Sequence, residues 1–359
     1  MRGSWFRGSL LERATVVWRG PRSQIGEPID VFGELGRARK LLVMPNDRVG
    51  GLFLGAPAYK ALRHHYPSAA IELLADEGKA DLARQIPFVD GVVTGDLSRP
   101  VWSAPFQQLS DALRQRQYDL AFCLGPDCSF RLARLCGLCG ARLRIGFRRQ
   151  GSSGFNLEIV RTHTDVYEGQ QYLTMLRLLG MQDHGQVHWR ISADKAQHIR
   201  SRYLDRDFAS GSVVGIDLSA GEGRGLSGRQ FDDIVGRVIE HGARAVLFFT
   251  LAERKQVTYL KKTYGNRILA FEQDDLAGVA ALMEGCRALI SCNTDLLHLA
   301  ISLQIPAVGI FHEDPRRWIS PDNQRVKVVE ARDVRAVSIS QVVQALDLTL
   351  RPELREGRP

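Results

Sequence analysis

Three short polar turns carry the residues whose types and spacing could do chemistry. They cover 46–51 (NDRVGG), 219–225 (SAGEGRG) and 293–298 (NTDLLH), and each stands between an apolar run and a helical pattern. Backbone N–H groups exposed at such a turn, and at the start of the following helix, can bind an anionic ligand. Arg48 and Arg224 could each add a charge-assisted hydrogen bond. The turns are therefore candidates for holding a diphosphate.

A purely structural role explains the same residues. Glycines are common in tight strand-to-helix turns, which accounts for Gly50 and Gly51, and the arginine of the second turn would be solvated. Asn293 or Thr294 would serve as the N-cap of the third helix. His298, one helical turn further along, would be a partly buried histidine with its hydrogen bonds satisfied. Both interpretations stay open on these residues alone.

Strand patterns alternate with helical patterns along most of the chain. This alternation is typical of parallel, doubly wound sheets, in which ligands bind beyond the carboxyl ends of the strands. It restarts after the polar segment 182–195, our predicted domain boundary. We therefore predict an α/β fold of GT-B type, with two Rossmann-like domains facing across a cleft. The predicted strands are 40–45, 70–75, 90–94, 118–124 and 143–147, then 212–218, 243–250, 267–271, 287–292 and 306–311.

Four segments follow from this pattern. They are an N-terminal extension at 1–39, an N-terminal domain at 40–190, a C-terminal domain at 191–335, and a C-terminal helix and tail at 336–359. The extension mixes arginines with Trp5, Phe6 and Trp18. Such a mixture suits a membrane surface or a groove on a protein partner. An arm packed on its own domain is the alternative.

Composition narrows the class of protein. The 359 residues are 44% hydrophobic and 25% charged, with a formal net charge of +8. The basic excess favours anionic partners, but neither zinc-finger spacing nor an aromatic RNA-binding pattern is present, so nucleic acid is not expected. No apolar run is long enough for a membrane span, and the N-terminus does not resemble a signal peptide. We expect a cytoplasmic protein.

In their order, the three turns resemble those of glycosyltransferase family 9, the ADP-heptose:lipopolysaccharide heptosyltransferases. The segment KLLVMPNDRVGGLFLGAPAYKALRHHYP is similar to the family's opening strand, its D-R-I-G-D turn and its P-x-x-x-A-L-R helix. The segment ALISCNTDLLHLAISLQIPAVGIFHEDPRRWISP is similar to the family's S-N-D-S/T-G-x-x-H block. The resemblance implies an inverting, metal-independent transfer without a cofactor, with the acceptor bound by the domain at 40–190 and the nucleotide sugar by the domain at 191–335. It implies a nucleotide-sugar donor of ADP-heptose type and an anionic glycolipid acceptor at the inner membrane.

The match is uneven at the residues that the resemblance assigns to the site. The resemblance implies a carboxylate base in the first turn, a basic residue in the second turn, and a diphosphate at the N-terminus of the helix that follows the third turn. Gly51 stands where the family has its catalytic Asp, and Asp295 replaces a Gly at the third helix. The implied catalytic residues are Asp47, Arg48 and Arg224, with Gly50 and Gly51 in the turn and Glu253, Asn293, Thr294, Asp295 and His298 for the donor.

These departures leave two main hypotheses. A working heptosyltransferase-like enzyme would need a substitute base, for which Asp47 and Glu222 are candidates. The alternative is a catalytically inactive relative that serves as a scaffold or binding subunit. A carboxylate at Asp295 favours the second hypothesis, because it complements its own helix dipole and repels a diphosphate. A third hypothesis is a GT-B enzyme with another donor, in which Asp295 contacts a sugar hydroxyl.

Four cysteines add a separate question. Cys123, Cys128, Cys136 and Cys139 have the spacing C-x₄-C-x₇-C-x₂-C. Four thiols this close could bind zinc or an iron–sulfur cluster. However, Cys123 ends an apolar strand, and the last two lie on one face of a predicted helix, as small core residues do. We predict no metal site.

Overall fold

The structure is a computed structural model that describes residues 29–149, 154–161, 166–185, 187, 191–203, 212–219 and 225–350. Most of the predicted extension, residues 1–28, lies outside these ranges. So do Glu222 and Arg224 of the second turn.

The N-terminal half is built on a six-stranded parallel sheet with the strand order β3-β2-β1-β4-β5-β6. Its central strand is fully buried from Leu41 to Met44, as expected for a parallel strand covered by helices on both faces. The strands are β1 (Lys40–Met44), β2 (Ala70–Asp76), β3 (Gly91–Gly95), β4 (Leu120–Cys123), β5 (Leu143–Phe147) and β6 (Leu157–Ile159).

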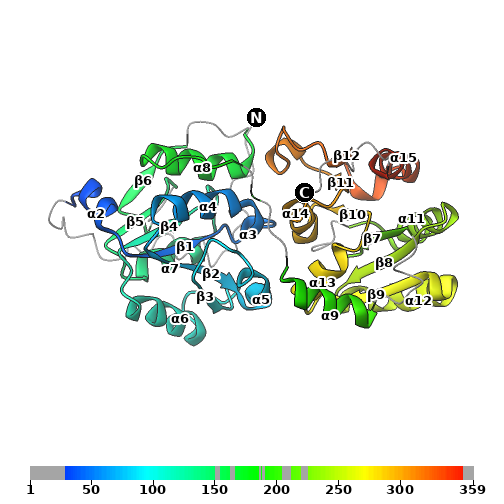
Figure 1. Cartoon of the computed structure of the whole chain (residues 1–359), viewed down its shortest axis with the longest axis horizontal. Coiled ribbons are helices and arrows are strands. Elements are labelled where there is room, and N and C mark those ends of the chain that lie inside the picture. The colour runs from blue at the N-terminus through cyan, green and yellow to red at the C-terminus, as the bar shows by residue number, and fades with distance from the viewer. Residues whose placement is uncertain are drawn as a thin grey trace.

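The C-terminal half repeats the arrangement. Its six parallel strands have the order β12-β11-β10-β7-β8-β9, so the first strand of each half pairs with the second and the fourth. Figure 1 shows the two sheets side by side. The strands are β7 (Val213–Asp217), β8 (Arg244–Phe249), β9 (Ile268–Glu272), β10 (Ala288–Cys292), β11 (Ala307–Phe311) and β12 (Val326–Glu330).

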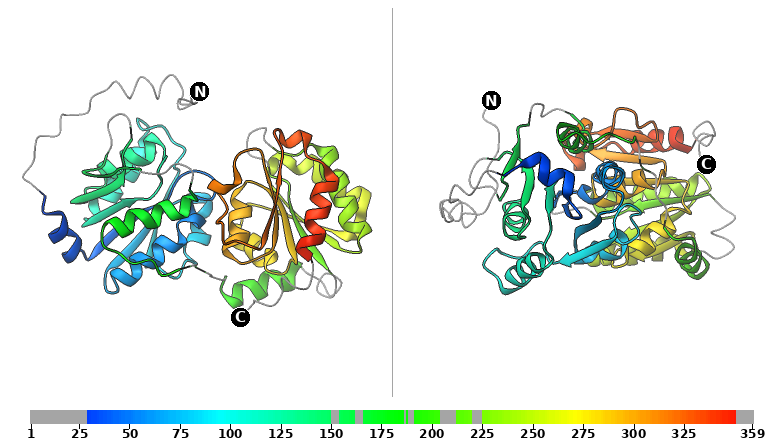
Figure 2. Two further views of the ribbon diagram at one scale, coloured as in Figure 1. Left: turned by 90° about the horizontal axis from the view of Figure 1, so that it is seen from above. Right: turned by 60° about the vertical axis from the view of Figure 1, so that its left-hand side comes forward.

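Helices cover both sheets (Figures 1 and 2). In the first half they are α2 (Val31–Arg37), α3 (Gly51–Leu54), α4 (Ala56–His65), α5 (Ala80–Ala83), α6 (Ala104–Gln115), α7 (Phe130–Leu138) and α8 (Glu168–Leu178). In the second half they are α9 (Ala193–Tyr203), α11 (Gly228–Glu240), α12 (Arg254–Tyr264), α13 (Leu276–Met283), α14 (Asp295–Ser302) and α15 (Ile339–Leu350). The predicted α/β fold with two Rossmann-like sheets is confirmed.

Some elements differ from the sequence prediction. The turn at 46–51 is followed by two helices, α3 and α4, which meet at Gly55. Pro57 lies in the first turn of α4, where a missing N–H is tolerated, and the Tyr59 hydroxyl donates to the Leu52 carbonyl oxygen at 3.0 Å. The edge strands β6 and β12 and the helix α2 were not predicted. The described residues contain no helix that is long and apolar enough to cross a membrane.

The strand order places the expected ligand crevice at the seam between the halves. In each sheet the order reverses at the central pair, β1 and β4 or β7 and β10, and the carboxyl ends of such a pair form the usual ligand crevice. The turns at 46–51 and 293–298 leave β1 and β10. They meet across the seam, where α3 lies next to α14 (Figure 1).

Candidate functional site

The first turn leaves no room for a side chain at the position of the expected base. Gly50 has a φ of 71°, in the left-handed region that glycine tolerates. A Cβ at Gly51 would lie 2.0 Å from the carbonyl oxygen of Asn46. The backbone itself, and not only the residue type, therefore excludes a carboxylate here.

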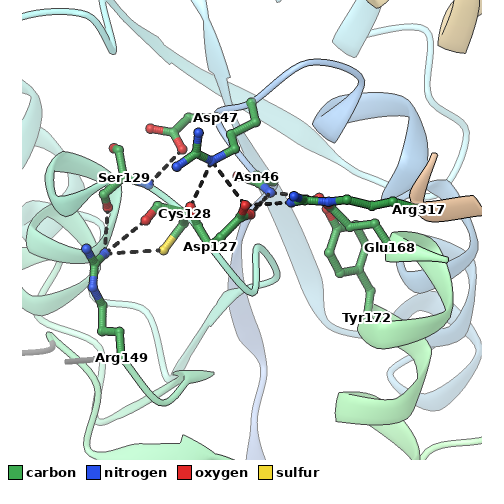
Figure 3. Close-up of polar contacts among 10 residues, drawn as sticks. Asn46, Asp47, Asp127, Cys128, Ser129, Arg149, Glu168, Tyr172 and Arg317 are labelled. Atoms are coloured by element: carbon green, nitrogen blue, oxygen red, sulfur yellow. Dashed lines mark hydrogen bonds and ion pairs between the residues drawn. The ribbon is translucent and has the colours of Figure 1, made fainter. Parts of the chain in front are cut away.

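Asp47 and Arg48 point toward the loop after β4. An Asp47 carboxylate oxygen accepts a hydrogen bond from the Ser129 N–H at 2.9 Å, at the start of α7 (Figure 3). Arg48 Nε donates to the carbonyl oxygen of Asp127 at 2.9 Å and lies 3.3 Å from its carboxylate. Asp47 thus orders a neighbouring loop.

Asp295 reaches across the seam from the first turn of α14. Its Oδ1 accepts a hydrogen bond from the Gly50 N–H at 2.7 Å, and its Oδ2 lies 2.6 Å from the Lys79 ammonium. Burial opposes ionisation, but Lys79 and the Gly50 N–H outweigh it, so the pKa of Asp295 is below its ordinary value. Both carboxylate oxygens are bound by the opposite half, which sequence reasoning had not foreseen.

His298 lies beneath this contact and is buried. Its ring faces Gly50, where a Cβ would stand 2.4 Å from the ring, and its Nε2 is 2.9 Å from the Asn293 amide oxygen. Burial lowers the pKa of His298 to about 4, and Lys79 adds to the effect against the attraction of Asp295. The imidazole is therefore neutral at pH 7 and carries no charge to offer a diphosphate.

The start of α14 is held by a buried carboxylate of its own half. Asp217, the last residue of β7, accepts hydrogen bonds from Thr294 Oγ1 at 2.6 Å and from Ser291 Oγ at 2.8 Å. Burial raises its pKa. Thr294 is the N-cap residue, but its side chain makes no capping bond. Asp217 was missed by the sequence analysis, although its place at a strand end marks it.

A second network of charges also spans the seam (Figure 3). Arg317, at the end of a short helical turn after β11, lies 2.5 Å from an Asp127 oxygen and 3.0 Å from a Glu168 oxygen. Asn46 joins the two carboxylates, donating to Asp127 at 3.0 Å and to Glu168 at 2.7 Å. The Tyr172 hydroxyl also donates to Glu168. Arg317 is thus held by both partners in the opposite half.

The carboxylates of this network are buried to different degrees. Glu168 is fully buried, whereas the Asp127 side chain keeps 22% of its surface exposed. Burial works against ionisation of Asp127, but Arg317 and Arg48 lower its pKa overall. Arg317 also stacks over the Trp318 ring at 4.7 Å. The sequence analysis missed these residues because no local pattern indicates a contact between residues 190 positions apart, such as Asp127 and Arg317.

The other predicted residues serve local structure or lie outside the described ranges. Glu253 accepts hydrogen bonds from the N–H and hydroxyl of Thr250, at 2.9 and 2.7 Å, and so caps its own turn. Asn293 also donates to Glu313 at 2.8 Å. Arg224 lies outside the residues that the structure describes.

The four clustered cysteines are buried free thiols in the core of the first half. The Cys139 thiol contacts the carbonyl oxygen of Cys136 at 3.0 Å, and Arg149 lies 3.8 Å from the Cys128 sulfur. Within the described ranges, no group of three or more His, Cys, Asp and Glu residues is placed to hold a metal ion.

A pocket of about 270 Å³ is lined by residues on either side of Lys79, Gly78 and Ala80 among them. Residues from both halves line it. Four carry carboxyl groups, Glu77, Asp81, Asp274 and Asp275, against one guanidinium, Arg84. This surplus of negative charge disfavours a diphosphate.

Known proteins share both sequence and architecture with the chain. Residues 106–342, about two thirds of it, match the profile of glycosyltransferase family 9 (heptosyltransferase). Lipopolysaccharide heptosyltransferase 2 of Escherichia coli (strain K12) is 23% identical over 319 residues, which are 81% of this chain and 87% of that protein.

Solved structures agree on the fold. The structure of E. coli ADP-heptose lps heptosyltransferase II superimposes with a TM-score of 0.71 at 18% identity, covering 89% of this chain and 100% of the other. E. coli heptosyltransferase WaaC with ADP gives a TM-score of 0.68 at 17% identity, covering 86% and 99%. The architecture is therefore GT-B, and the chain belongs to glycosyltransferase family 9.

Proposed function

We propose that this chain is a non-catalytic family-9 homologue that serves as a binding or scaffold subunit. The observation that carries the proposal is the turn at 46–51. An inverting transfer needs a general base beside the acceptor hydroxyl. The family resemblance places that base at position 51, where the Asn46 carbonyl oxygen leaves no space even for a Cβ.

The seam supports the same proposal. The resemblance assigns the start of α14 to the donor diphosphate. Here Asp295 brings a carboxylate to that place and binds the opposite half through Gly50 and Lys79. A diphosphate would have to displace this contact and approach a negative charge in a partly desolvated seam. The neutral His298 offers no compensation.

A donor-turnover assay tests the proposal. The purified chain is incubated with ADP-heptose and lipopolysaccharide core acceptors, and released ADP is measured, with E. coli lipopolysaccharide heptosyltransferase 2 as the positive control. We expect no ADP above background. Gly51→Asp should not restore turnover, because the added side chain displaces the turn. Steady, acceptor-dependent release of ADP by the wild type contradicts the proposal.

A second candidate is active transfer from a nucleotide sugar of ADP-heptose type to a lipopolysaccharide or other glycolipid acceptor. One observation favours it. Asp127 follows β4, lies at the seam, and is a partly exposed carboxylate in the predicted acceptor half. If turnover is found, Asp127 is the candidate base, and Asp127→Asn should abolish transfer while nucleotide binding remains.

The chain's location and partners belong to this proposal as well. We place it in the cytoplasm, peripheral to the inner membrane, on the strength of its basic charge and its family. The extension at residues 1–39, which mixes arginines with tryptophans, would dock on a protein or on a membrane surface. Deletion of residues 1–28, which leaves α2 in place, should release the chain from its partner or from the membrane fraction without unfolding it.

A further inference from the structure

The Asp295 carboxylate binds two donors that could equally bind the oxygens of a ligand. One carboxylate oxygen accepts a hydrogen bond from the backbone N–H of Gly50, which has a left-handed conformation, and the other pairs with the Lys79 ammonium group. An N–H group at a glycine turn paired with a lysine is a common donor set for phosphate oxygens. The donors lie in one half of the molecule, and the carboxylate comes from the other.

The seam carries further polar atoms that have no partner. Asn46 Oδ1, His298 Nδ1 and Trp318 Nε1 are buried side-chain atoms without a hydrogen-bond partner in the described part of the chain. His298 belongs to α14, its ring lies 5.9 Å from the ring of Trp318, and Arg317 stacks over Trp318, whereas Asn46 Oδ1 faces Gly125 within the first half. A buried polar group without a hydrogen-bond partner is unfavourable. A ligand at the seam could pair with His298 Nδ1 and Trp318 Nε1, the two of these atoms that lie beside α14 and Arg317.

We infer that the Asp295 carboxylate is an internal competitor for a phosphate-bearing ligand at the seam. It holds the Gly50 N–H and the Lys79 ammonium, and so ties the halves together at the place where a phosphate or diphosphate would bind. The inference rests on the proposed binding role and names its ligand class. An intramolecular carboxylate competes at a high effective concentration, so the wild-type chain binds such a ligand weakly.

Removal of the single charge tests the inference. Inorganic pyrophosphate and ADP are titrated calorimetrically into the wild type, Asp295→Asn and Asp295→Gly. Asp295→Asn keeps the shape of the side chain, and circular dichroism checks that each variant is folded. Affinity for pyrophosphate should rise at least tenfold in both variants. Adding Lys79→Met to Asp295→Gly should remove most of the gain.

Asp274→Asn is the matched control. It also removes one negative charge beside the seam, but Asp274 is exposed and has no part in the contact with Gly50 and Lys79. It should change the affinity less than threefold. Equal gains in Asp274→Asn and Asp295→Asn would mean that net charge alone acts, and would overturn the inference.

The titrations have other decisive outcomes. Folded Asp295 variants that bind neither pyrophosphate nor ADP overturn the inference, as does a wild type that binds as tightly as they do. A gain for ADP that exceeds the gain for pyrophosphate assigns the site to a nucleotide, and equal gains assign it to the phosphates alone. Acceptor-dependent turnover, in contrast, would overturn the non-catalytic role and leave the competition by Asp295 to be judged by these titrations.

Discussion

Single residues decide what the seam can do. Gly51, Asp295 and His298 occupy positions that the family resemblance assigns to base, diphosphate and donor site. In the structure they provide a closed turn, a contact between the halves and a neutral ring. The sequence could identify Gly51 and Asp295 as departures. It could not show that backbone packing excludes a side chain at 51, because the Asn46 carbonyl is positioned by the folded turn.

Gly51→Ala tests the packing of the turn. A Cβ in van der Waals conflict with the Asn46 carbonyl oxygen should cost about 1–3 kcal/mol, measured as the free energy of unfolding in urea. Gly36→Ala is the control, because no atom lies within 4 Å of its Cβ position in the exposed part of α2. It should be neutral or slightly stabilising. Equal effects of the two substitutions would contradict the tight turn.

His298 should make stability depend on pH. Its pKa is about 4 in the folded chain and about 6.5 when unfolded, so the unfolded chain binds more protons between these values. Stability from this group is complete above pH 6.5 and falls as the pH drops toward 4, by about 2 kcal/mol at pH 5. Chemical denaturation of the wild type and His298→Gln at pH 7.5 and 5.0 measures it. Between pH 7.5 and 5.0, the free energy of unfolding should fall by about 2 kcal/mol less in the variant than in the wild type. An equal fall in both proteins would show that the pKa of His298 is not lowered by folding.

At the scale of elements, the sequence predicted the strands in which consecutive residues are all buried. Parallel strands such as β1 and β10 read as continuous apolar runs because both of their faces are covered. The edge strand β6 is only three residues long, and β12 alternates between buried and exposed residues, so neither has such a run. The short helix α2 was missed because only Glu34 and Leu35 of it are buried.

Contacts between distant elements could not be predicted at all. Lys79 and Asp295, or Arg317 and Glu168, are brought together by the way the two sheets face each other. No local pattern distinguishes Lys79 or Arg317 from a solvated cation. The candidate turns were therefore recognisable, whereas their partners across the seam were not.

Arg317→Ala tests how strongly the loop after β11 is attached to α8. It leaves the fully buried Glu168 without its cation, which should cost about 3–5 kcal/mol in the free energy of unfolding. Arg316→Ala is the neighbouring control, because Arg316 pairs with Asp314 in an exposed setting and should matter by less than about 0.5 kcal/mol. A small effect at both positions would mean that the network does not hold the loop.

At the scale of the whole molecule, two Rossmann-like halves are fastened by two separate sets of charges. Asp295 contacts Gly50 and Lys79, and Arg317 contacts Asp127 and Glu168. Each set joins loops that the GT-B arrangement places at the ligand crevice. The chain's own side chains therefore hold the two halves together in the free protein.

The distance between the halves tests this most directly. All six native cysteines are buried, so spin labels can be placed at Ala112→Cys on α6 and Lys262→Cys on α12, both exposed positions. Pulsed electron paramagnetic resonance should give one narrow distance distribution that millimolar ADP leaves unchanged. Adding Asp295→Asn and Arg317→Ala should lengthen and broaden it. A broad distribution in the labelled chain without these two changes, or one that ADP shifts, would contradict a crevice closed by its own charges.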